Sequence, residues 1–345
     1  MESKKSNNNL KYISQLRQDP VSGDWIVIAT GRNKRFGDLS LTKENRIISD
    51  RALCPFEDLR VTGHEKPILV EHLAGSSKWF LQIFENKYPA FKPGDISISE
   101  KRVGPYGIIN GRGYHELLVV EDHERPLSKY NPDELAFIFT ALQKRYRQIA
   151  SDSKIKYISI FHNWGPSAGA SIYHPHLQIV AIPVIPPMIQ HSLDGSARYF
   201  TNHQQCVHCE MIKFEINEKK RIIFENETAI AFSPFVSREP FEIRIFPKIH
   251  QPYFEDSSES LISGMSEILS FSLNAIWERL HDPDLNFFIH LAPIVEKEEY
   301  GHYHWHIEII PKISISAGFE LGTGIEITTV DPDEGAAFLR GDISG

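Results

Sequence analysis

Several short segments of the chain carry apolar residues at every second position or in unbroken runs, a pattern typical of β-strands. In the first half, it predicts strands at WIVIAT (25–30), HELLVVED (115–122), YISIFHN (157–163) and HLQIVAI (176–182). One segment between them has a different period. It opens with Asn131-Pro132-Asp133-Glu134, a typical helix start. Apolar residues then recur at three- and four-residue spacing as far as Tyr146, which predicts a helix to about Ala150.

The second half of the chain repeats this order of elements. Strands are predicted at IIFEN (222–226), AIAFSPF (229–235), FEIRIFP (241–247), LNFFIHLAP (285–293) and HWHIEII (304–310), with a helix at about 258–280. HPHLQIV at 174 and HWHIEII at 304 both read His-x-His-x-(Gln/Glu) before apolar residues. We therefore expect an α+β fold with an internal duplication, mainly antiparallel sheets and flanking helices. Prolines at 183, 186 and 187 place the boundary between a first half, 1–187, and a second half, 188–345.

Composition and charge narrow the classes of function. The 345 residues are 41% hydrophobic, enough for a packed core, and carry a formal charge of −8, which does not suit nucleic-acid binding. The most apolar stretch, 177–189, is short and broken by three prolines, so it cannot span a membrane. The first residues lack the apolar core of a signal peptide. We expect a cytoplasmic protein in which the three cysteines are not disulfides.

The stretch NWGPSAGASIYHPHLQIV (163–180) holds the clearest candidate chemistry. Residues two apart in a strand face the same way, so His174, His176 and Gln178 would share one face. Pro175 cannot donate to a sheet ladder, so the strand starts here or lies at an edge. The small residues of the preceding segment, GPSAGAS, let backbone N–H groups approach an anion such as a phosphate. A neutral imidazole is a good nucleophile near pH 7 and could attack a phosphate bound there. For an isolated His-x-His pair, metal binding or a buried structural role would be the simpler interpretation.

The pattern Asn-x-Gly-x-x-Ala-Gly-Ala-Ser-x-x-His-Pro-His-x-Gln, from Asn163 to Gln178, resembles the active-site signature of the galactose-1-phosphate uridylyltransferase family. This family is the nucleotidyl-transferring branch of the histidine-triad superfamily. The resemblance continues in RQDPVSGDWIVIATGRNKR (17–35), CPFE (54–57), ENKYPAF (85–91), PFEIRIFPKIH (240–250) and HWHIEIIPKISISAGFELGTG (304–324). It implies a fold of two histidine-triad-like halves, in agreement with the internal repeat.

The resemblance also implies a role for each matched residue. His176 would be the nucleophile that attacks the α-phosphorus of a nucleoside diphosphate sugar, and Gln178 would donate to a phosphate oxygen. The other substrate-binding residues that it implies are Arg32 and Arg35 near the sugar phosphate, Asn86 and Asn163 on the nucleotide side, Gly169, Ala170 and Ser171 around the phosphate, and Glu320 near the sugar hydroxyls. The two arginines could instead be a solvated basic turn, and the glutamate an ordinary surface acid.

Metal binding is indicated first in the second half. Cys206 and Cys209 form a Cys-x-x-Cys pair, the spacing of two tetrahedral zinc ligands. The resemblance adds His250 and His304 as the remaining ligands, with His306 as an alternative or additional one.

The first half departs from the family pattern, because Glu57 stands where the family often has a second cysteine. A carboxylate can bind zinc, so the resemblance implies a mixed site. Its ligands would be Cys54, Glu57, His123 and His174. A hydrogen-bonded cluster without metal is the alternative, and His115 is a further candidate ligand. Zinc and iron both stay open.

The function that the resemblance implies is exchange of UMP between UDP-glucose and a hexose 1-phosphate, with galactose 1-phosphate as the expected acceptor. It would follow a ping-pong route through a uridylyl-histidine. ENKYPAF is also similar to relatives that transfer an adenylyl group from ADP-glucose to phosphate, and the base cannot be read from the sequence. A nucleotide hydrolase and a nucleotide- or metal-binding protein without turnover are further alternatives. The expected partners are a nucleoside diphosphate sugar, a sugar 1-phosphate and, as is common in the family, a second copy in a homodimer.

Overall fold

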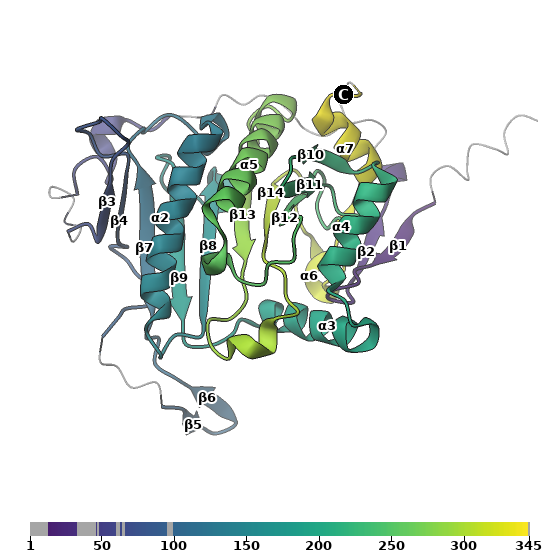
Figure 1. Cartoon of the computed structure of the whole chain (residues 1–345), viewed down its shortest axis with the longest axis horizontal. Helices are drawn as coiled ribbons and strands as arrows, with labels where there is room; N and C mark the ends of the chain where they lie inside the picture. Colours follow the sequence, from purple (N-terminus) through teal and green to yellow (C-terminus); the bar gives the residue numbers. More distant parts are fainter. Residues whose placement is uncertain are drawn as a thin grey trace, which may run out of the picture.

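The structure is a computed structural model that describes residues 13–32, 46, 48–59, 63, 66–94 and 99–343. One antiparallel sheet of ten strands runs through it and carries both halves of the chain (Figure 1). From one edge to the other, its strands are β10 (Ile222–Glu225), β11 (Ala229–Phe232), β12 (Ile243–Pro247), β14 (His306–Pro311), β13 (Leu285–His290), β8 (Tyr157–Trp164), β9 (His176–Ile182), β7 (Tyr114–Val120), β4 (Leu81–Glu85) and β3 (Leu69–Glu71).

The strand order shows the duplication. Read outward from the centre, one half is β8, β9, β7, β4, β3 and the other is β13, β14, β12, β11, β10. In each half the corresponding strands also follow each other in the same order along the chain, with a long helix after the third. The predicted α+β fold with two similar halves is therefore confirmed. Because β8 and β13 pair directly, the halves share one sheet, and the boundary between residues 187 and 188 stays a prediction.

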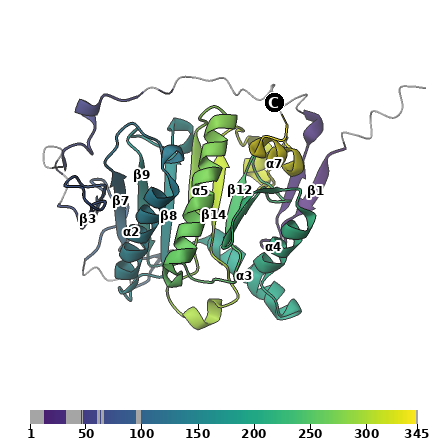
Figure 2. The same ribbon diagram turned by 45° about the horizontal axis from the view of Figure 1, so that its top comes forward.

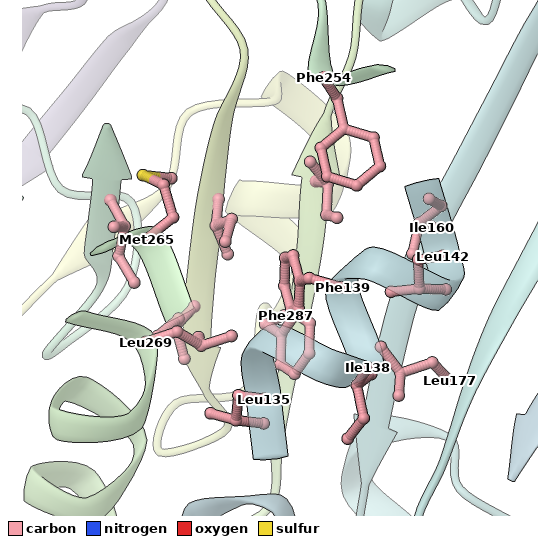
Figure 3. Close-up of a cluster of buried hydrophobic side chains, with 14 of the residues drawn as sticks. Leu135, Ile138, Phe139, Leu142, Ile160, Leu177, Phe254, Met265, Leu269 and Phe287 are labelled. Atoms are coloured by element: carbon pink, nitrogen blue, oxygen red, sulfur yellow. The ribbon is translucent and has the colours of Figure 1, made fainter. Parts of the chain in front are cut away.

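The two long helices, α2 (Pro132–Ala150) and α5 (Glu259–Arg279), lie side by side on the same face of this sheet (Figures 1 and 2). Both were predicted from their apolar spacing. Figure 3 shows the core that they form with the strands, from Leu135, Ile138, Phe139 and Leu142 of α2, Met265 and Leu269 of α5, and Ile160, Leu177 and Phe287 of the sheet.

Polar side chains fix where these helices begin. The Asn131 side chain accepts from the backbone N–H of Glu134, and the Glu134 carboxylate accepts from the backbone N–H of Asn131. The Ser258 hydroxyl accepts from the N–H of Leu261 at the start of α5. Each such cap stabilises its helix by about 1 kcal/mol.

Shorter elements surround the sheet. α3 (Pro187–His203) and α4 (Val207–Glu218) connect the halves and were not predicted, since the prolines before α3 were interpreted only as a break and Cys206 and Cys209 only as a metal-binding pair. The prolines expected to mark a break do so, and Pro187 also serves as the first residue of α3. The remaining elements are β1 (Gln15–Gln18), β2 (Trp25–Ile28) and β15 (Ile327–Thr328) in one small sheet, the hairpin β5 (Lys101–Val103) and β6 (Tyr106–Ile108), and helices α6 (Gly318–Thr323) and α7 (Pro332–Arg340). Across the described part of the chain, no helix is both long and apolar enough to cross a membrane.

The face of the sheet opposite α2 and α5 is called the site face below. Leu118 and Val120 of β7 belong to the core under the helices, whereas their neighbours Leu117 and Val119 belong to a separate buried cluster. That cluster also contains Cys54 and Phe56, so a segment far away in the sequence covers the site face here.

Candidate active site

The strand β9 carries His176 as its first residue, between β7 and β8 in the sheet. The sequence predicted a strand start or an edge at Pro175, and the structure shows a strand start in the interior of the sheet. His176 and Gln178 lie two residues apart, and Gln178 pairs with Leu117, which points to the site face. The alternate residues Leu177 and Ile179 are buried in the core on the helix side.

His176 is held as a neutral imidazole with one free nitrogen. Its Nδ1 lies 2.9 Å from the carbonyl oxygen of His174. A carbonyl only accepts, so Nδ1 carries the hydrogen and Nε2 keeps its lone pair. Burial lowers the pKa of His176, a residue that is 6% exposed, and this favours the neutral form at pH 7. The ring of Phe56 packs edge-on against it at 5.3 Å.

Gln178 lies in a network with two residues from the neighbouring strands of the first half. Its Oε1 is 3.0 Å from Nε2 of His115, which is on β7. Asn86, directly after β4, places its amide nitrogen 3.1 Å from the same ring nitrogen. The predicted substrate residues Asn86 and Gln178 are thus brought together, and His115 lies between them.

The loop that follows β8 is held by residues from the other half of the chain. Asn286 of β13 donates through its amide nitrogen to Oδ1 of Asn163 at 2.9 Å and to the carbonyl oxygen of Ala168 at 2.8 Å. The backbone N–H of Ser167 donates to Asp284 at 2.6 Å. These second-half residues have no motif of their own, and sequence reasoning did not find them.

The amides of this loop are largely used within the protein. The N–H groups of Gly169 and Ala170 donate to the carbonyls of Pro166 and Gly165 at 3.0 Å each. Anion binding by these two amides, as the sequence suggested, would therefore compete with bonds already present. Ser171 is exposed, so its hydroxyl is accessible to a ligand.

The first cluster of candidate metal ligands joins the four residues that the sequence indicated. Their ligand atoms lie within 4.8 Å of one another: Cys54, Glu57, His123 and His174. Nδ1 of His123 and Nδ1 of His174 are 3.2 Å apart, and Oε1 of Glu57 is 3.2 Å from the first and 3.5 Å from the second.

Hydrogen bonds made by the Nε2 atoms of His123 and His174 determine the protonation of the Nδ1 atoms that face the cluster. Nε2 of His123 donates to the carbonyl of Ser49 at 3.0 Å, and Nε2 of His174 donates to the carbonyl of Val120 at 2.6 Å. Both Nδ1 atoms are then unprotonated, and two lone pairs at 3.2 Å repel each other unless a cation lies between them. Oε1 of Glu57 is also buried without a hydrogen-bond partner in the described chain. The donor set therefore fits zinc.

The second cluster lies where the Cys-x-x-Cys pair begins α4. Cys209 Sγ is 3.5 Å from Nδ1 of both His250 and His304, and Cys206 Sγ is 4.0 Å from Nδ1 of His304. Neighbouring ligand atoms of a tetrahedral zinc site are about 3.6 Å apart, given its usual bond lengths. Nε2 of His250 donates to the carbonyl of Gly301 at 2.8 Å, which leaves its Nδ1 free for a metal.

His306 lies outside this second cluster and forms the counterpart of His176. Its Nδ1 is 3.0 Å from the carbonyl oxygen of His304, the same arrangement as in the first half. It groups with His290 and Glu308, and a cavity of ≈ 110 Å³ opens beside them. Arg244 and Arg238 pair with Glu308 at 2.9 and 2.8 Å. The repeated His-x-His pattern already aligned His306 with His176, but the sequence analysis considered His306 only as a further metal ligand.

The structure does not test the predicted roles of three substrate residues. Arg35 and the side chain of Arg32 lie outside the described residues. Glu320 is in α6, where its carboxylate accepts from the backbone N–H of Ala317 at 2.9 Å. Its role near a sugar stays a prediction.

Comparisons with known proteins give consistent matches. The family model described as galactose-1-phosphate uridyl transferase, N-terminal domain, matches residues 3–186, and a domain of unknown function matches residues 127–338. ADP-glucose phosphorylase of Arabidopsis thaliana is 32% identical over 94% of this chain and 92% of its own length. The galactose-1-phosphate uridylyltransferase of Thermotoga maritima is 28% identical over 94% of this chain and 98% of its own length. A crystal structure of the Arabidopsis enzyme with bound ADP-glucose superimposes with a TM-score of 0.80 and 31% identity, covering 96% of this chain and 100% of that one.

Proposed function

Because this chain belongs to the galactose-1-phosphate uridylyltransferase family and is a nucleotidyltransferase, we propose that His176 carries the nucleotidyl group of a nucleoside diphosphate sugar to a phosphate-bearing acceptor. The observation that carries the proposal is the state of His176. The hydrogen bond from its Nδ1 to the His174 carbonyl leaves the Nε2 lone pair available, and burial keeps the ring neutral.

In the first step, Nε2 of His176 forms a bond to the α-phosphorus while the bond from that phosphorus to the bridging oxygen breaks. The sugar 1-phosphate leaves with the electron pair. The imidazole becomes cationic, and the His174 carbonyl on Nδ1 stabilises that charge. In the second step, an oxygen of the acceptor phosphate attacks the same phosphorus and His176 leaves. No general base is required, because the attacking oxygen is already anionic.

Gln178 and Ser171 are the proposed donors to the phosphate oxygens during both steps, because Gln178 lies two residues after His176 and Ser171 is exposed in the loop before it. Asn163 and Asn86 are proposed to contact the nucleotide side. The same geometry argues against a binding protein without turnover, since such a protein would not need the nucleophile, its tautomer and the donor together.

Two donor and acceptor pairs are proposed for this site. The sequence led us to expect UDP-glucose with a hexose 1-phosphate, galactose 1-phosphate in particular, and the 28% identical Thermotoga relative supports that pair. Adenylyl transfer from ADP-glucose to phosphate is the second candidate. It is favoured by the 32% identical relative and by the superposition on a structure that holds ADP-glucose, so it should be tested first.

The donor and acceptor can be assigned by product analysis. The protein is incubated with ADP-glucose or UDP-glucose, each with phosphate or with galactose 1-phosphate, and the products are separated by anion-exchange chromatography. We expect glucose 1-phosphate release that depends on one base and one acceptor and disappears in His176→Ala. Release without any acceptor, at the same rate, would instead indicate a hydrolase.

We also propose that both Cys/His clusters hold zinc in a structural role. Cys54, Glu57, His123 and His174 would hold one ion, and Cys206, Cys209, His250 and His304 the other. Bound zinc would supply fixed cross-links that hold the segment just before His176 to the segments around Cys54 and His123, and the segment before β14 to the start of α4. Elemental analysis of the purified protein should find about two zinc ions per chain if all four ligands act in each site. About one ion per chain would contradict one of the two assignments, and a content near zero would contradict both.

A further inference from the structure

We propose that His115 is a positioning residue that fixes the orientation of the Gln178 amide. This inference rests on the proposed function, in which Gln178 donates a hydrogen bond to the phosphate being transferred. A glutamine amide can sit in either of two orientations related by a flip, and only one of them presents its NH₂ group to an anion.

The tautomer of His115 follows from its neighbours. The backbone N–H of Ala90 points at Nδ1 of His115 at 3.2 Å, and a backbone N–H only donates. Nδ1 therefore accepts, and in the neutral ring the hydrogen is on Nε2. Two secondary-structure elements fix this contact, because Ala90 follows β4, His115 is in β7, and the N–H of Asn86 donates to the His115 carbonyl at 2.9 Å.

The Nε2–H of His115 in turn selects the orientation of Gln178. An N–H group can bond only to an acceptor, and Oε1 of Gln178 lies 3.0 Å from Nε2 of His115. The carbonyl oxygen of the amide is thereby directed to His115, and its NH₂ group is kept for another acceptor. The flipped amide would place two donors against each other and would turn an oxygen toward a phosphate.

The amide of Asn86 is oriented in the same way. Its Oδ1 accepts from the backbone N–H of Tyr88 at 2.9 Å, so its nitrogen is the atom 3.1 Å from Nε2 of His115. In this tautomer both atoms carry hydrogen, so they face each other as two donors and do not bond. The contact with Ala90 decides the tautomer, because a backbone N–H cannot turn away as a side-chain amide can. The Asn86 NH₂ group is therefore also kept for an acceptor that a bound ligand would supply.

This assignment replaces the alternative that His115 is a metal ligand. Both of its ring nitrogens face protein groups of Ala90, Gln178 and Asn86. The first metal cluster is complete without it, through four other residues. His115 acts through Gln178, so its loss should slow the transfer of the nucleotidyl group more than it weakens donor binding.

The test is a double-mutant cycle on the rate of nucleotidylation of His176, measured by rapid mixing with ADP-glucose and with UDP-glucose. His115→Leu removes the Nε2–H at similar volume, and His115→Gln returns an N–H at about the same place. We expect His115→Leu to lower the single-turnover rate about 10- to 100-fold with the donor Kd changed less than about 3-fold. His115→Gln should recover most of that loss. In the Gln178→Ala background, His115→Leu should have an effect of less than about 2-fold.

Additive losses in the two backgrounds would overturn the positioning role, as would a loss that appears entirely in donor Kd. Long-range ¹⁵N–¹H spectra give a readout that does not depend on turnover. The histidine signal that is present in the wild-type spectrum and absent in that of His115→Leu belongs to His115. We expect this signal to show the Nε2–H tautomer, and an Nδ1–H tautomer would overturn the inference. A wild-type protein that forms no adduct with either donor, yet shows the Nε2–H tautomer, would refute the proposed function instead and with it the catalytic purpose of this contact.

Discussion

At the scale of single residues, the two His-x-His pairs differ in the side chain two positions after the second histidine, and this difference is consistent with the proposed role of His176 as the nucleophile. His176 and His306 have the same hydrogen bond from Nδ1 to a backbone carbonyl. Gln178 follows the first, and Glu308 follows the second. Burial opposes ionisation of Glu308, but Arg244 and Arg238 outweigh it and hold the pKa of its carboxyl well below the usual range. A carboxylate at this place repels a phosphate.

This comparison predicts the effect of making the first half resemble the second. Gln178→Glu removes an N–H donor and adds a negative charge, whereas Gln178→Met removes the donor alone at similar size. We expect the methionine variant to lose about 10- to 100-fold in the rate of transfer and the glutamate variant at least about tenfold more. Thermal melting should differ between the two by only a few degrees, about 2–4 °C at most. Equal rates for the two variants would contradict the role of Gln178 beside the phosphate.

The residues of the site could be predicted to different degrees. The shared face of His174, His176 and Gln178 and the pairing of Cys206 with Cys209 follow from spacing, because a strand places alternate residues on one face and a Cys-x-x-Cys pair places two sulfurs together. The role of His176 and the other metal ligands, Cys54, Glu57, His123, His174, His250 and His304, were implied only by the family resemblance. Asn286 and His115 could not be assigned in the same way. Their roles depend on which strands become neighbours in the sheet, and a single sequence does not specify that pairing.

At the scale of elements, β2, the strands from β7 to β14 and the two long helices were predicted because their apolar periodicity is strong, and capping residues mark the start of both helices. The short strands β1, β3, β4, β5, β6 and β15 were not predicted. The helices α3 and α4 were not predicted, although α3 has an apolar face comparable to that of α2, because the prolines at 183, 186 and 187 were interpreted only as a break. The loop from Gly165 to Gly169 also depends on another element. Gly165 has a φ of 85°, and an added Cβ would collide with Asp284, which precedes β13.

The loop offers a matched pair of substitutions. Gly165 and Gly169 both have a φ of 85°, but the nearest atom to an added Cβ at Gly169 is 3.8 Å away. Gly169→Ala should therefore cost about 1–2 kcal/mol from backbone strain alone. Gly165→Ala adds a steric clash and should destabilise the protein by about 3 kcal/mol or more. Denaturant unfolding of both variants measures the difference, and similar stabilities would show that Asp284 does not restrain this loop.

At the scale of the whole molecule, the duplicated halves form a single sheet and are not separate bodies. β8 pairs with β13 from Ile160↔Ile289 to Trp164↔Leu285, and α2 packs against α5 over their length. The site also crosses this junction, because Asn286 and Asp284 from the second half hold the loop after β8. The sequence repeat predicted two halves, but it contained no information on how they join.

This junction predicts the behaviour of the first half on its own. A fragment of residues 1–187 would expose one edge of β8 and the apolar side of α2, so it should aggregate and should not unfold cooperatively. Co-expression with residues 188–345 should restore a soluble complex. Size-exclusion chromatography and thermal unfolding measure both outcomes. A monomeric fragment with a cooperative transition would show that the halves are independent domains.

The central claim is that His176 becomes covalently attached to a nucleotide, and intact mass spectrometry after incubation with ADP-glucose or UDP-glucose, without acceptor, tests it most directly. Samples are kept alkaline because a phosphoramidate is labile in acid, and His176→Ala is the control. The account predicts one nucleotidyl group per wild-type chain and none on the variant, and the mass of the group identifies the base. An unmodified wild-type chain with both donors, in metal-replete protein, or an adduct that persists in His176→Ala, would contradict the account.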